Sequence, residues 1–256
     1  MAAIPDFLIV GAQKAGTTSA ARNLSLHPEI NMFCGTTEFG QKEIEFFNQH
    51  WEMGISWYAS HFQKSAAMVG EKTAELLHRL ICHERMCRTN SRFKLVVLLR
   101  SPVDRAYSQW KMAALHKRDE SEGFEAVVER ELATLDDNSV KERIYNCSDA
   151  GVSCWREGYL LKGMYAEQLD SLFKWFSKKQ VWIGISEQLR RNPAIVYADM
   201  FDFLGVSCFK SDFAEHFVGP PCPPMSARMR SLLRDIYRRP NERLFSMLDT
   251  DITDWD

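Results

Sequence analysis

A short apolar segment at residues 7–10 runs directly into a glycine loop at residues 11–16, and three hydroxyl residues follow the loop. A strand, a glycine loop and a helix in this order gather backbone N–H groups and the positive end of the helix dipole around one point. Such a point binds phosphate. The segment therefore predicts a strand that ends at an anion site, followed by a helix over about 17–26 that ends before Pro28.

The spacing of this loop is that of the ATP-binding P-loop, but its lysine is in a different place. Gly11 and Gly16 keep the P-loop spacing, whereas Thr17 stands where the P-loop has its lysine, and Lys14 lies inside the loop. The hydroxyl that holds magnesium beside that lysine therefore has no clear counterpart. We predict a nucleotide-phosphate site without a metal, with contacts from Lys14, Ala15, Gly16, Thr17, Thr18 and Ser19.

Apolar strands alternate with amphipathic helices along the rest of the chain. Residues 95–99 are all apolar, which is typical of a central parallel strand buried on both faces. Further strands are predicted near 68–69 and over 181–185, and helices over 74–86, 101–116, 161–176, 192–204 and 228–248, the last interrupted near Pro240. We predict an α/β fold: a single domain over residues 1–256 with a mostly parallel, doubly wound sheet and a P-loop-like phosphate-binding loop.

Arg100 follows the strand at 95–99, at the edge where parallel sheets bind their ligands. Ser101 and Pro102 are typical of a helix start, which places Ser108 two turns along that helix. A guanidinium donates two hydrogen bonds to a phosphate, and a serine hydroxyl adds one more. Arg100 and Ser108 are therefore candidate phosphate contacts, and the alternative is an ordinary arginine at a strand end.

Two of these segments resemble the sulfotransferases that use 3′-phosphoadenosine 5′-phosphosulfate (PAPS). Residues 13–18 fit the first phosphate-binding loop of that family, Gln-Lys-x-Gly-Thr-Thr, and residues 99–108 look like its second motif. The resemblance implies PAPS as donor, 3′-phosphoadenosine 5′-phosphate (PAP) as product, and Arg100 and Ser108 as contacts of the 3′-phosphate. Lys14 would be catalytic, because it can stabilise charge on the bridging oxygen.

Residues 42–48, 54–58 and 71–73 are similar to the heparan sulfate N-sulfotransferases and 3-O-sulfotransferases. In that family the first glutamate of Glu-x-x-Phe-Phe is the general base, which assigns this role to Glu43. The lysine of Glu-Lys-[Ser/Thr] faces the sulfonate and the acceptor there, which implies that Lys72 is catalytic. Glu45 departs from the histidine or glutamine common at its position. The alternatives are a solvated loop edge for Glu43 and a surface ion pair for Lys72.

The C-terminal part resembles glycosaminoglycan sulfotransferases at Tyr237, Asn241 and Leu244, and a chondroitin 6-O-sulfotransferase is an equally good relative there. Those enzymes carry a disulfide-closed hairpin and a Lys-Gly-Arg loop that also touches PAPS. This chain has a short proline-rich segment at 219–225 instead. The third nucleotide contact is either lost or supplied by Arg228 or Arg230.

The leading hypothesis is a PAPS-dependent sulfotransferase that acts on a hydroxyl or amine of a carbohydrate. A second hypothesis keeps PAPS but makes the acceptor a small alcohol, amine or phenol. A P-loop kinase and a non-catalytic binding protein are the remaining alternatives. Against a kinase, the chain lacks the Gly-Lys-[Ser/Thr] of the P-loop. Against a non-catalytic protein, Lys14, Glu43, Arg100 and Ser108 are all present.

The net charge of −2 argues against wholesale nucleic-acid binding, and the apolar runs are far too short to cross a bilayer. We expect no nucleic-acid partner and no transmembrane segment in this chain. Both a soluble cytoplasmic enzyme and a catalytic domain trimmed from an enzyme of the Golgi lumen fit these features.

Seven cysteines leave at least one thiol without an internal partner. Cys147 and Cys154 are the expected pair if the protein matures in an oxidising compartment. A zinc site could be imagined on one helix, from His78, Cys82, His83 and Cys87. Four ligands of one tetrahedral metal rarely come from one short helix, so we expect no metal.

Overall fold

The computed structural model describes residues 4–33, 37, 43–63, 67–117, 120–146, 157–216 and 222–255. Its centre is a sheet of five parallel strands in the order β2-β3-β1-β4-β5. The strands are β1 (Phe7–Gly11), β2 (Ile30–Met32), β3 (Met68–Lys72), β4 (Lys94–Leu99) and β5 (Val181–Ile185). After β1 the chain forms β2 and then β3 on one side of β1, and then β4 and β5 on the other side. The predicted parallel, doubly wound α/β sheet is therefore confirmed.

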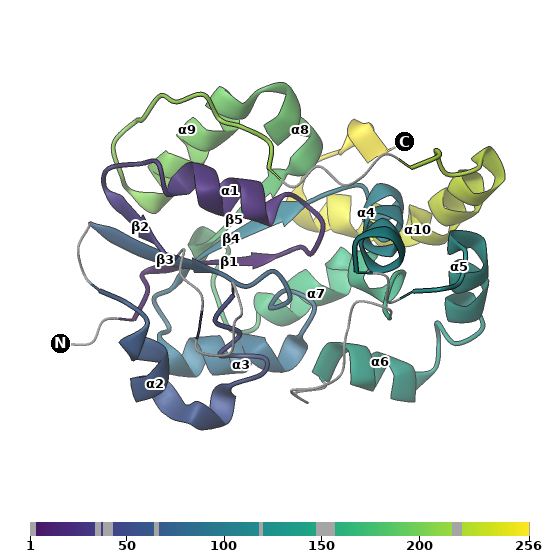
Figure 1. The fold of residues 1–256 in the computed structure, drawn as a ribbon, viewed down its shortest axis with the longest axis horizontal. Coiled ribbons are helices and arrows are strands. Elements are labelled where there is room, and N and C mark those ends of the chain that lie inside the picture. Colours follow the sequence, from purple (N-terminus) through teal and green to yellow (C-terminus); the bar gives the residue numbers. More distant parts are fainter. Residues whose placement is uncertain are drawn as a thin grey trace.

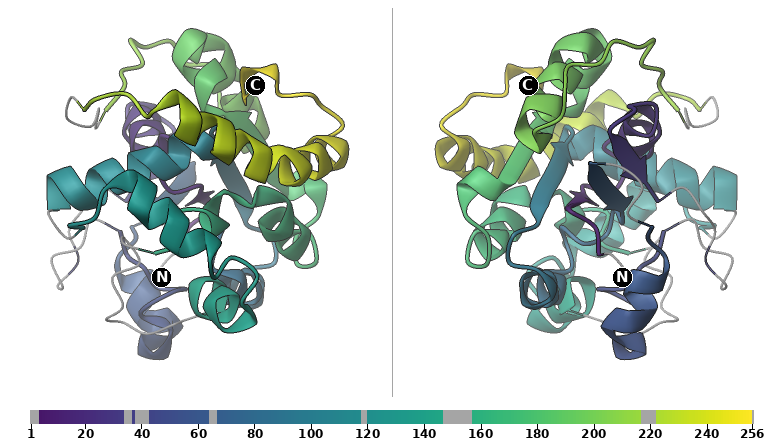
Figure 2. Two further views of the ribbon diagram at one scale, coloured as in Figure 1. Left: turned by 90° about the vertical axis from the view of Figure 1, so that its right-hand side faces the viewer. Right: turned by 90° about the vertical axis from the view of Figure 1, so that its left-hand side faces the viewer.

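Helices cover both faces of this sheet (Figure 1). One face carries α1 (Thr17–Leu24), α8 (Ser186–Arg191) and α9 (Pro193–Leu204), and the other carries α2 (Gly54–Ser60), α3 (Leu80–Thr89) and α7 (Tyr165–Leu172). The remaining helices are α4 (Pro102–Lys111), α5 (Phe124–Leu132), α6 (Asn138–Asn146) and α10 (Ala227–Leu248). In the left view of Figure 2, α10 crosses the end of the molecule where it packs on α4 and α7.

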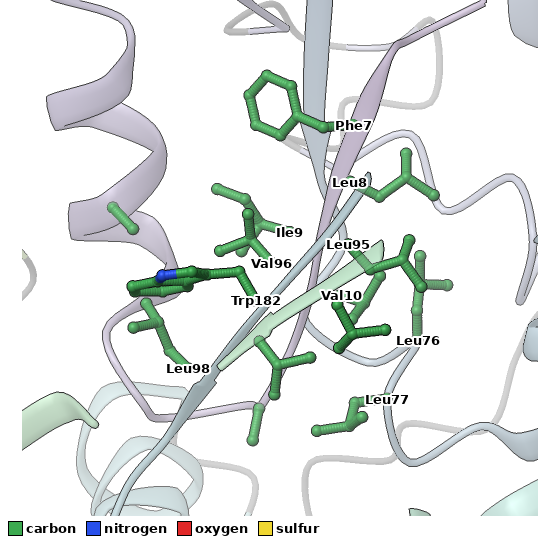
Figure 3. Close-up of a cluster of buried hydrophobic side chains, with 14 of the residues drawn as sticks. Phe7, Leu8, Ile9, Val10, Leu76, Leu77, Leu95, Val96, Leu98 and Trp182 are labelled. Atoms are coloured by element: carbon green, nitrogen blue, oxygen red, sulfur yellow. The ribbon is translucent and has the colours of Figure 1, made fainter. Parts of the chain in front are cut away.

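The core lies where the three central strands meet the two helical layers. Leu8 pairs with Leu95 and Ile9 with Val96 across β1 and β4, and all four side chains are fully buried. Figure 3 shows Ile9 and Val96 on the side of α1, and Leu8 and Leu95 on the opposite side with Leu76 and Leu77. Burial on both faces explains why these strands are apolar without alternation.

Two predicted helix ends are found in the structure, although the Ser101 side chain makes no capping hydrogen bond. Helix α4 begins at Pro102 directly after Ser101, and its last turns continue as a π-helix over Met112–Lys117, close to the predicted end. Gly205 ends α9 with a φ of 79°, a left-handed conformation that glycine adopts without steric cost.

The helix predicted over 74–86 is wrong in its first half, because α3 begins only at Leu80. The preceding residues form turns that pack under the phosphate loop: the Leu77 N–H donates to the Val10 carbonyl at 2.8 Å, and a Cβ on Gly11 would come within 2.7 Å of the Leu77 Cβ. Contact with β1 therefore overrides the local helical pattern.

Two other predicted helices differ from the structure. The helix over 161–176 is a 3₁₀ turn (Leu161–Gly163) followed by α7, because Met164 has a non-helical ψ of 65°. Conversely, α10 runs unbroken through Pro240, although a proline inside a helix costs about 3 kcal/mol. Its buried residues Leu233, Tyr237 and Leu244 account for this, because packing on α4 and α7 compensates for the lost hydrogen bond.

The elements β2, α2 and α8 were not predicted, since each has only three to seven residues. No helix within the described residues is long and apolar enough to cross a membrane.

Candidate active site

The phosphate loop lies between the end of β1 and the start of α1. The Ala12 N–H donates to the Leu98 carbonyl at 2.7 Å, which ties the loop to β4. Gly16 precedes the first helical residue with a φ of 92°, and Lys14 is also left-handed with a φ of 72°. The loop thus turns sharply into α1, whose first N–H groups have no partner within the helix and can bind an anion.

Lys14 crosses from the loop to the far end of α4. Its Nζ lies 3.3 Å from the Met112 Sδ. Burial, followed by the positive charges of Arg100, Arg105 and Lys111, lowers the pKa of Lys14 to about 8. Cations that are crowded together in this way are stabilised by a bound anion.

Arg100 reaches back to the same loop from the end of β4. Its Nη1 donates to the Lys14 carbonyl at 3.1 Å, and its buried Nε finds no hydrogen-bond partner among the described residues. Burial is the main cause that lowers the pKa of Arg100, and Arg190 adds to it. Ser108 lies half-buried on α4. The structure therefore brings Lys14 and Arg100 together, as their predicted roles require.

The predicted hydroxyl contacts differ in their surroundings. Thr17 is buried and Thr18 is half-buried at the first turn of α1. The Ser19 hydroxyl accepts from the His216 N–H at 2.8 Å and lies 3.0 Å from the His216 carbonyl, to which it donates. In this structure Ser19 therefore fastens α1 to the segment before residue 217.

A cavity of about 90 Å³ opens beside Gly16, between α1, α8 and the segment 213–215. Sequence reasoning missed its wall, which includes Ser186, Arg190, Phe213 and Glu215. Phe213 stacks on Tyr197 with ring centroids 4.2 Å apart, and the Arg190 Nε donates to Glu215 at 2.9 Å. The carboxyl end of β5, directly before Ser186, was the feature that could have pointed to this wall.

The second predicted pair, Glu43 and Lys72, meets at the carboxyl end of β3. The Lys72 ammonium forms an ion pair with one oxygen of Glu43, and the Ala74 N–H donates to the other oxygen at 3.1 Å. The side chains keep 12% and 23% of their accessible surface, Lys72 the lower, so both are reachable from solvent. A carboxylate and a lysine thus lie together at the strand that neighbours β1.

Further carboxyl groups surround this pair. The pKa of Glu45 is raised to about 8 by burial and by Glu43 and Glu75. The pKa of Glu71, which is 1% exposed, is also raised to about 8, mainly by burial. At neutral pH both groups therefore hold a proton.

Gln13 joins the phosphate loop to two buried charged residues. Its Nε2 donates to Glu75 at 3.0 Å, and its Oε1 lies 3.4 Å from the ammonium of the buried Lys162. Because Gln13 precedes Lys14 in the loop, the phosphate loop is hydrogen-bonded to one of the buried carboxyl groups, that of Glu75.

Two of the four residues considered for zinc have other hydrogen-bond partners. His83 directs its two ring nitrogens to Ser171 and to the Leu77 carbonyl, and the Cys82 thiol donates to the Phe47 carbonyl. Within the described ranges, no group of three histidine, cysteine, aspartate or glutamate side chains could hold a metal ion.

Other predictions fall partly outside the described residues. Lys42, Cys147, Cys154 and the start of the proline-rich segment 219–225 belong to the parts that are not described, so the disulfide stays a prediction. Arg230, proposed as a third nucleotide contact, pairs with Asp104 of α4 at 3.0 Å.

Comparisons with known proteins agree with the fold and the motifs. A sequence model of the sulfotransferase domain matches residues 4–217. The chain is 25% identical to the membrane-associated sulfotransferase kil1 of Dictyostelium discoideum, over 97% of this chain and 66% of that protein. It is 27% identical to the bifunctional heparan sulfate N-deacetylase/N-sulfotransferase 1 of Caenorhabditis briggsae, over 98% of this chain and 31% of that protein. The chain therefore corresponds to only part of each relative.

Among solved structures, a sulfotransferase from Alicyclobacillus acidocaldarius superposes with a TM-score of 0.76 and 26% identity, covering 99% of both chains. The sulfotransferase domain of the curacin biosynthetic pathway, with a TM-score of 0.51 and 12% identity, shares the fold. The predicted resemblance is therefore confirmed: this chain belongs to the sulfotransferase family and is a transferase enzyme.

Proposed function

We propose that this enzyme transfers the sulfonate of PAPS to a hydroxyl or amine of a carbohydrate acceptor. One observation supports this most: the Glu43–Lys72 ion pair keeps access to solvent at the carboxyl end of β3, the strand that pairs with β1, and β1 leads into the phosphate loop. A protein that only bound a nucleotide would not need a solvent-accessible carboxylate at this position.

The residues of the donor side fit PAPS. The N–H groups of residues 16–18 and the ammonium of Lys14 would hold the 5′-phosphosulfate, whereas the Ala15 N–H donates to the Ala12 carbonyl at 3.1 Å. Arg100 and Ser108 would hold the 3′-phosphate. The buried, unpartnered Arg100 Nε and the lowered pKa of Lys14 both indicate a site that gains stability from an anion. Bound PAPS supplies the sulfonate.

The acceptor side supplies the proton chemistry. Glu43 would take the proton of the acceptor O–H or N–H as the new bond to sulfur forms. The bond from sulfur to the bridging oxygen breaks, and Lys14 would stabilise the negative charge that this oxygen keeps in the released PAP. Lys72 forms an ion pair with Glu43, and it would contact the transferred sulfonate.

One observation favours the second acceptor class, a small alcohol, amine or phenol. Four carboxyl groups, Glu43, Glu45, Glu71 and Glu75, surround the acceptor side. Near them lie the cations Lys72 and Arg79. Because Glu45 and Glu71 hold protons and the other two carboxylates pair with Lys72 and Arg79, this side has no surplus of cations to attract a polyanionic chain, and it suits an uncharged acceptor.

We also propose that residues 1–256 form one sulfotransferase domain. The sequence match ends at residue 217, but α10 beyond it packs on α4 and α7 and places Tyr237 in contact with the Leu160 carbonyl at 2.9 Å.

The proposal is tested by incubating the enzyme with radiolabelled PAPS and a panel of desulfated polysaccharides, small alcohols, amines and phenols. We expect transfer to at least one acceptor, with Glu43→Gln as the inactive control. Transfer to small molecules alone would favour the second class. No transfer to any acceptor, together with no PAP formation, would contradict the proposed function.

A further inference from the structure

Glu187, in the first turn of α8, joins two segments that are far apart in the chain. Its Oε1 accepts from the Ser101 N–H at 3.1 Å, and its Oε2 accepts from the indole N–H of Trp255 at 3.3 Å. Ser101 and Trp255 are each 5% exposed. One carboxylate thus connects the start of α4 to the C-terminal 3₁₀ turn (Thr253–Trp255), which lies beside α8 in Figure 1.

The peptide group between Arg100 and Ser101 is also held at its carbonyl. The carbonyl of Arg100 and the N–H of Ser101 belong to one planar peptide unit. The hydroxyl of Tyr165 donates to that carbonyl at 3.0 Å, while Glu187 accepts from that N–H. Both polar groups of the unit are therefore fixed, and the plane from which the Arg100 side chain starts cannot rotate without the loss of a buried hydrogen bond.

The C-terminal turn is itself anchored. The ring of Trp255 contacts the rings of Tyr165 and Phe245, with centroids 5.9 Å and 5.8 Å apart. Asp254 forms an ion pair with Arg191 of α8. Trp255 therefore acts as a fixed support for Glu187 and Tyr165, although it lies beyond residue 217, where the family match ends.

Glu187 also acts on Arg100 through its charge. Its carboxylate and that of Asp104 favour the charged guanidinium, against the burial and the neighbouring Arg190 that disfavour it. Geometry and charge thus act on the same side chain.

We propose that Glu187 and Trp255 are positioning residues that aim Arg100 at the 3′-phosphate of the donor nucleotide. The inference rests on the proposed function, because it takes Arg100 to be the 3′-phosphate contact. Neither residue would touch the nucleotide for this role. Their effect should therefore appear only with ligands that carry a 3′-phosphate.

The test compares PAP with AMP, which lacks the 3′-phosphate, by calorimetric titration of the full chain. Trp255→Phe keeps the ring and removes the N–H, and Glu187→Gln keeps the size and removes the charge. We expect each variant to bind PAP roughly three- to tenfold more weakly, the range for one buried hydrogen bond, with AMP binding unchanged. Trp175→Phe, at a tryptophan that is 40% exposed, is the matched control and should change neither.

The outcomes separate the two claims. If the parent enzyme binds PAP no better than AMP, the proposed function itself fails. If the parent prefers PAP and both variants keep that preference, the positioning role is wrong. An equal loss of PAP and AMP binding in both variants would show a merely structural role and would also overturn the inference.

Discussion

The site has a donor half, with the phosphate loop, Lys14 and Arg100, and an acceptor half, with Glu43, Lys72 and the carboxyl groups around them. The two halves differ in charge, and the pKa values of their side chains shift in opposite directions. On the donor half, Lys14 lies among Arg100, Arg105 and Lys111, and its pKa falls to about 8. On the acceptor half, Glu45 and Glu71 lie among other carboxyl groups, and their pKa rises to about 8. Burial and like charges cause both changes. A bound anion would therefore stabilise the crowded cations around Lys14, whereas Glu45 and Glu71 hold protons beside the ion pair of Glu43 and Lys72.

Glu43→Gln should give the largest effect, because it removes the proposed base from the acceptor half and leaves the donor half intact. Glutamine has the same size but cannot accept the proton, so turnover should fall roughly a hundredfold or more while the affinity for PAP stays unchanged. Steady-state kinetics and calorimetry measure the two quantities.

Glu45→Gln is the matched control for that variant. Glu45 already holds a proton at neutral pH, because its pKa is raised to about 8, so the substitution should change turnover little. If Glu45→Gln abolished turnover and Glu43→Gln did not, the base would be assigned to the wrong glutamate.

Arg100→Ala removes the proposed charge-assisted phosphate contact from the donor half. We expect nucleotide binding to weaken by about 1.5 to 3 kcal/mol with folding preserved. The control is Arg88→Ala, at an arginine whose side chain is 71% exposed on α3. A folded Arg100→Ala protein that binds PAP as tightly as the parent would show that Arg100 only ends a strand.

The charge of Lys14 should make the donor half sensitive to alkaline pH. Because burial and neighbouring cations lower its pKa from 10.5 to about 8, the free enzyme loses this charge as the pH rises through 8. We expect kcat/KM for PAPS, which reports on the free enzyme, to fall above about pH 8. In Lys14→Arg the guanidinium stays protonated, so its lower activity should not fall over this range. The same fall in both proteins would assign the titration to another group.

Glu71→Gln should give the smallest effect, and this effect should be seen in the stability of the fold. In the folded protein the pKa of Glu71 is raised to about 8, whereas the ordinary pKa of a glutamate is 4.5. The stability of the parent therefore falls as the pH rises from 4.5 to 8, and the neutral glutamine avoids this loss. We expect the variant to melt at least roughly 2 to 4 °C higher at pH 8, because each kcal/mol of avoided loss raises the melting temperature of a chain of this size by about that much.

Thermal melts between pH 5 and 8 measure this difference, with the exposed Glu129→Gln as control. The gap between Glu71→Gln and the parent should shrink as the pH falls. A lower melting temperature at pH 8 would mean that the Glu71 carboxylate stabilises the fold.

The elements that could be predicted from the sequence are those specified locally. The strand 7–10, its glycine loop, the apolar strand that ends before Arg100 and the Gly205 helix end all follow from neighbouring residues. The helix over 74–86 could not be predicted correctly, because the N–H of Leu77 is used by β1, 67 residues earlier.

The site divides in the same way. The resemblance assigned roles to Glu43 and Lys72, but not their ion pair, which depends on how residues 44–71 fold back. The burial of Glu71, the wall at Phe213 and the support of Ser101 by Glu187 are contacts between distant segments. No periodicity or spacing in one segment reports on them.

Calorimetric titration with PAP and with ATP, each with and without magnesium, tests the central claim most directly. We expect PAP to bind much more tightly than ATP, independent of magnesium. The reasons are that Arg100 would contact a 3′-phosphate and that Thr17 replaces the P-loop lysine. Equal affinity for ATP, or binding that requires magnesium, would contradict this account and favour a kinase.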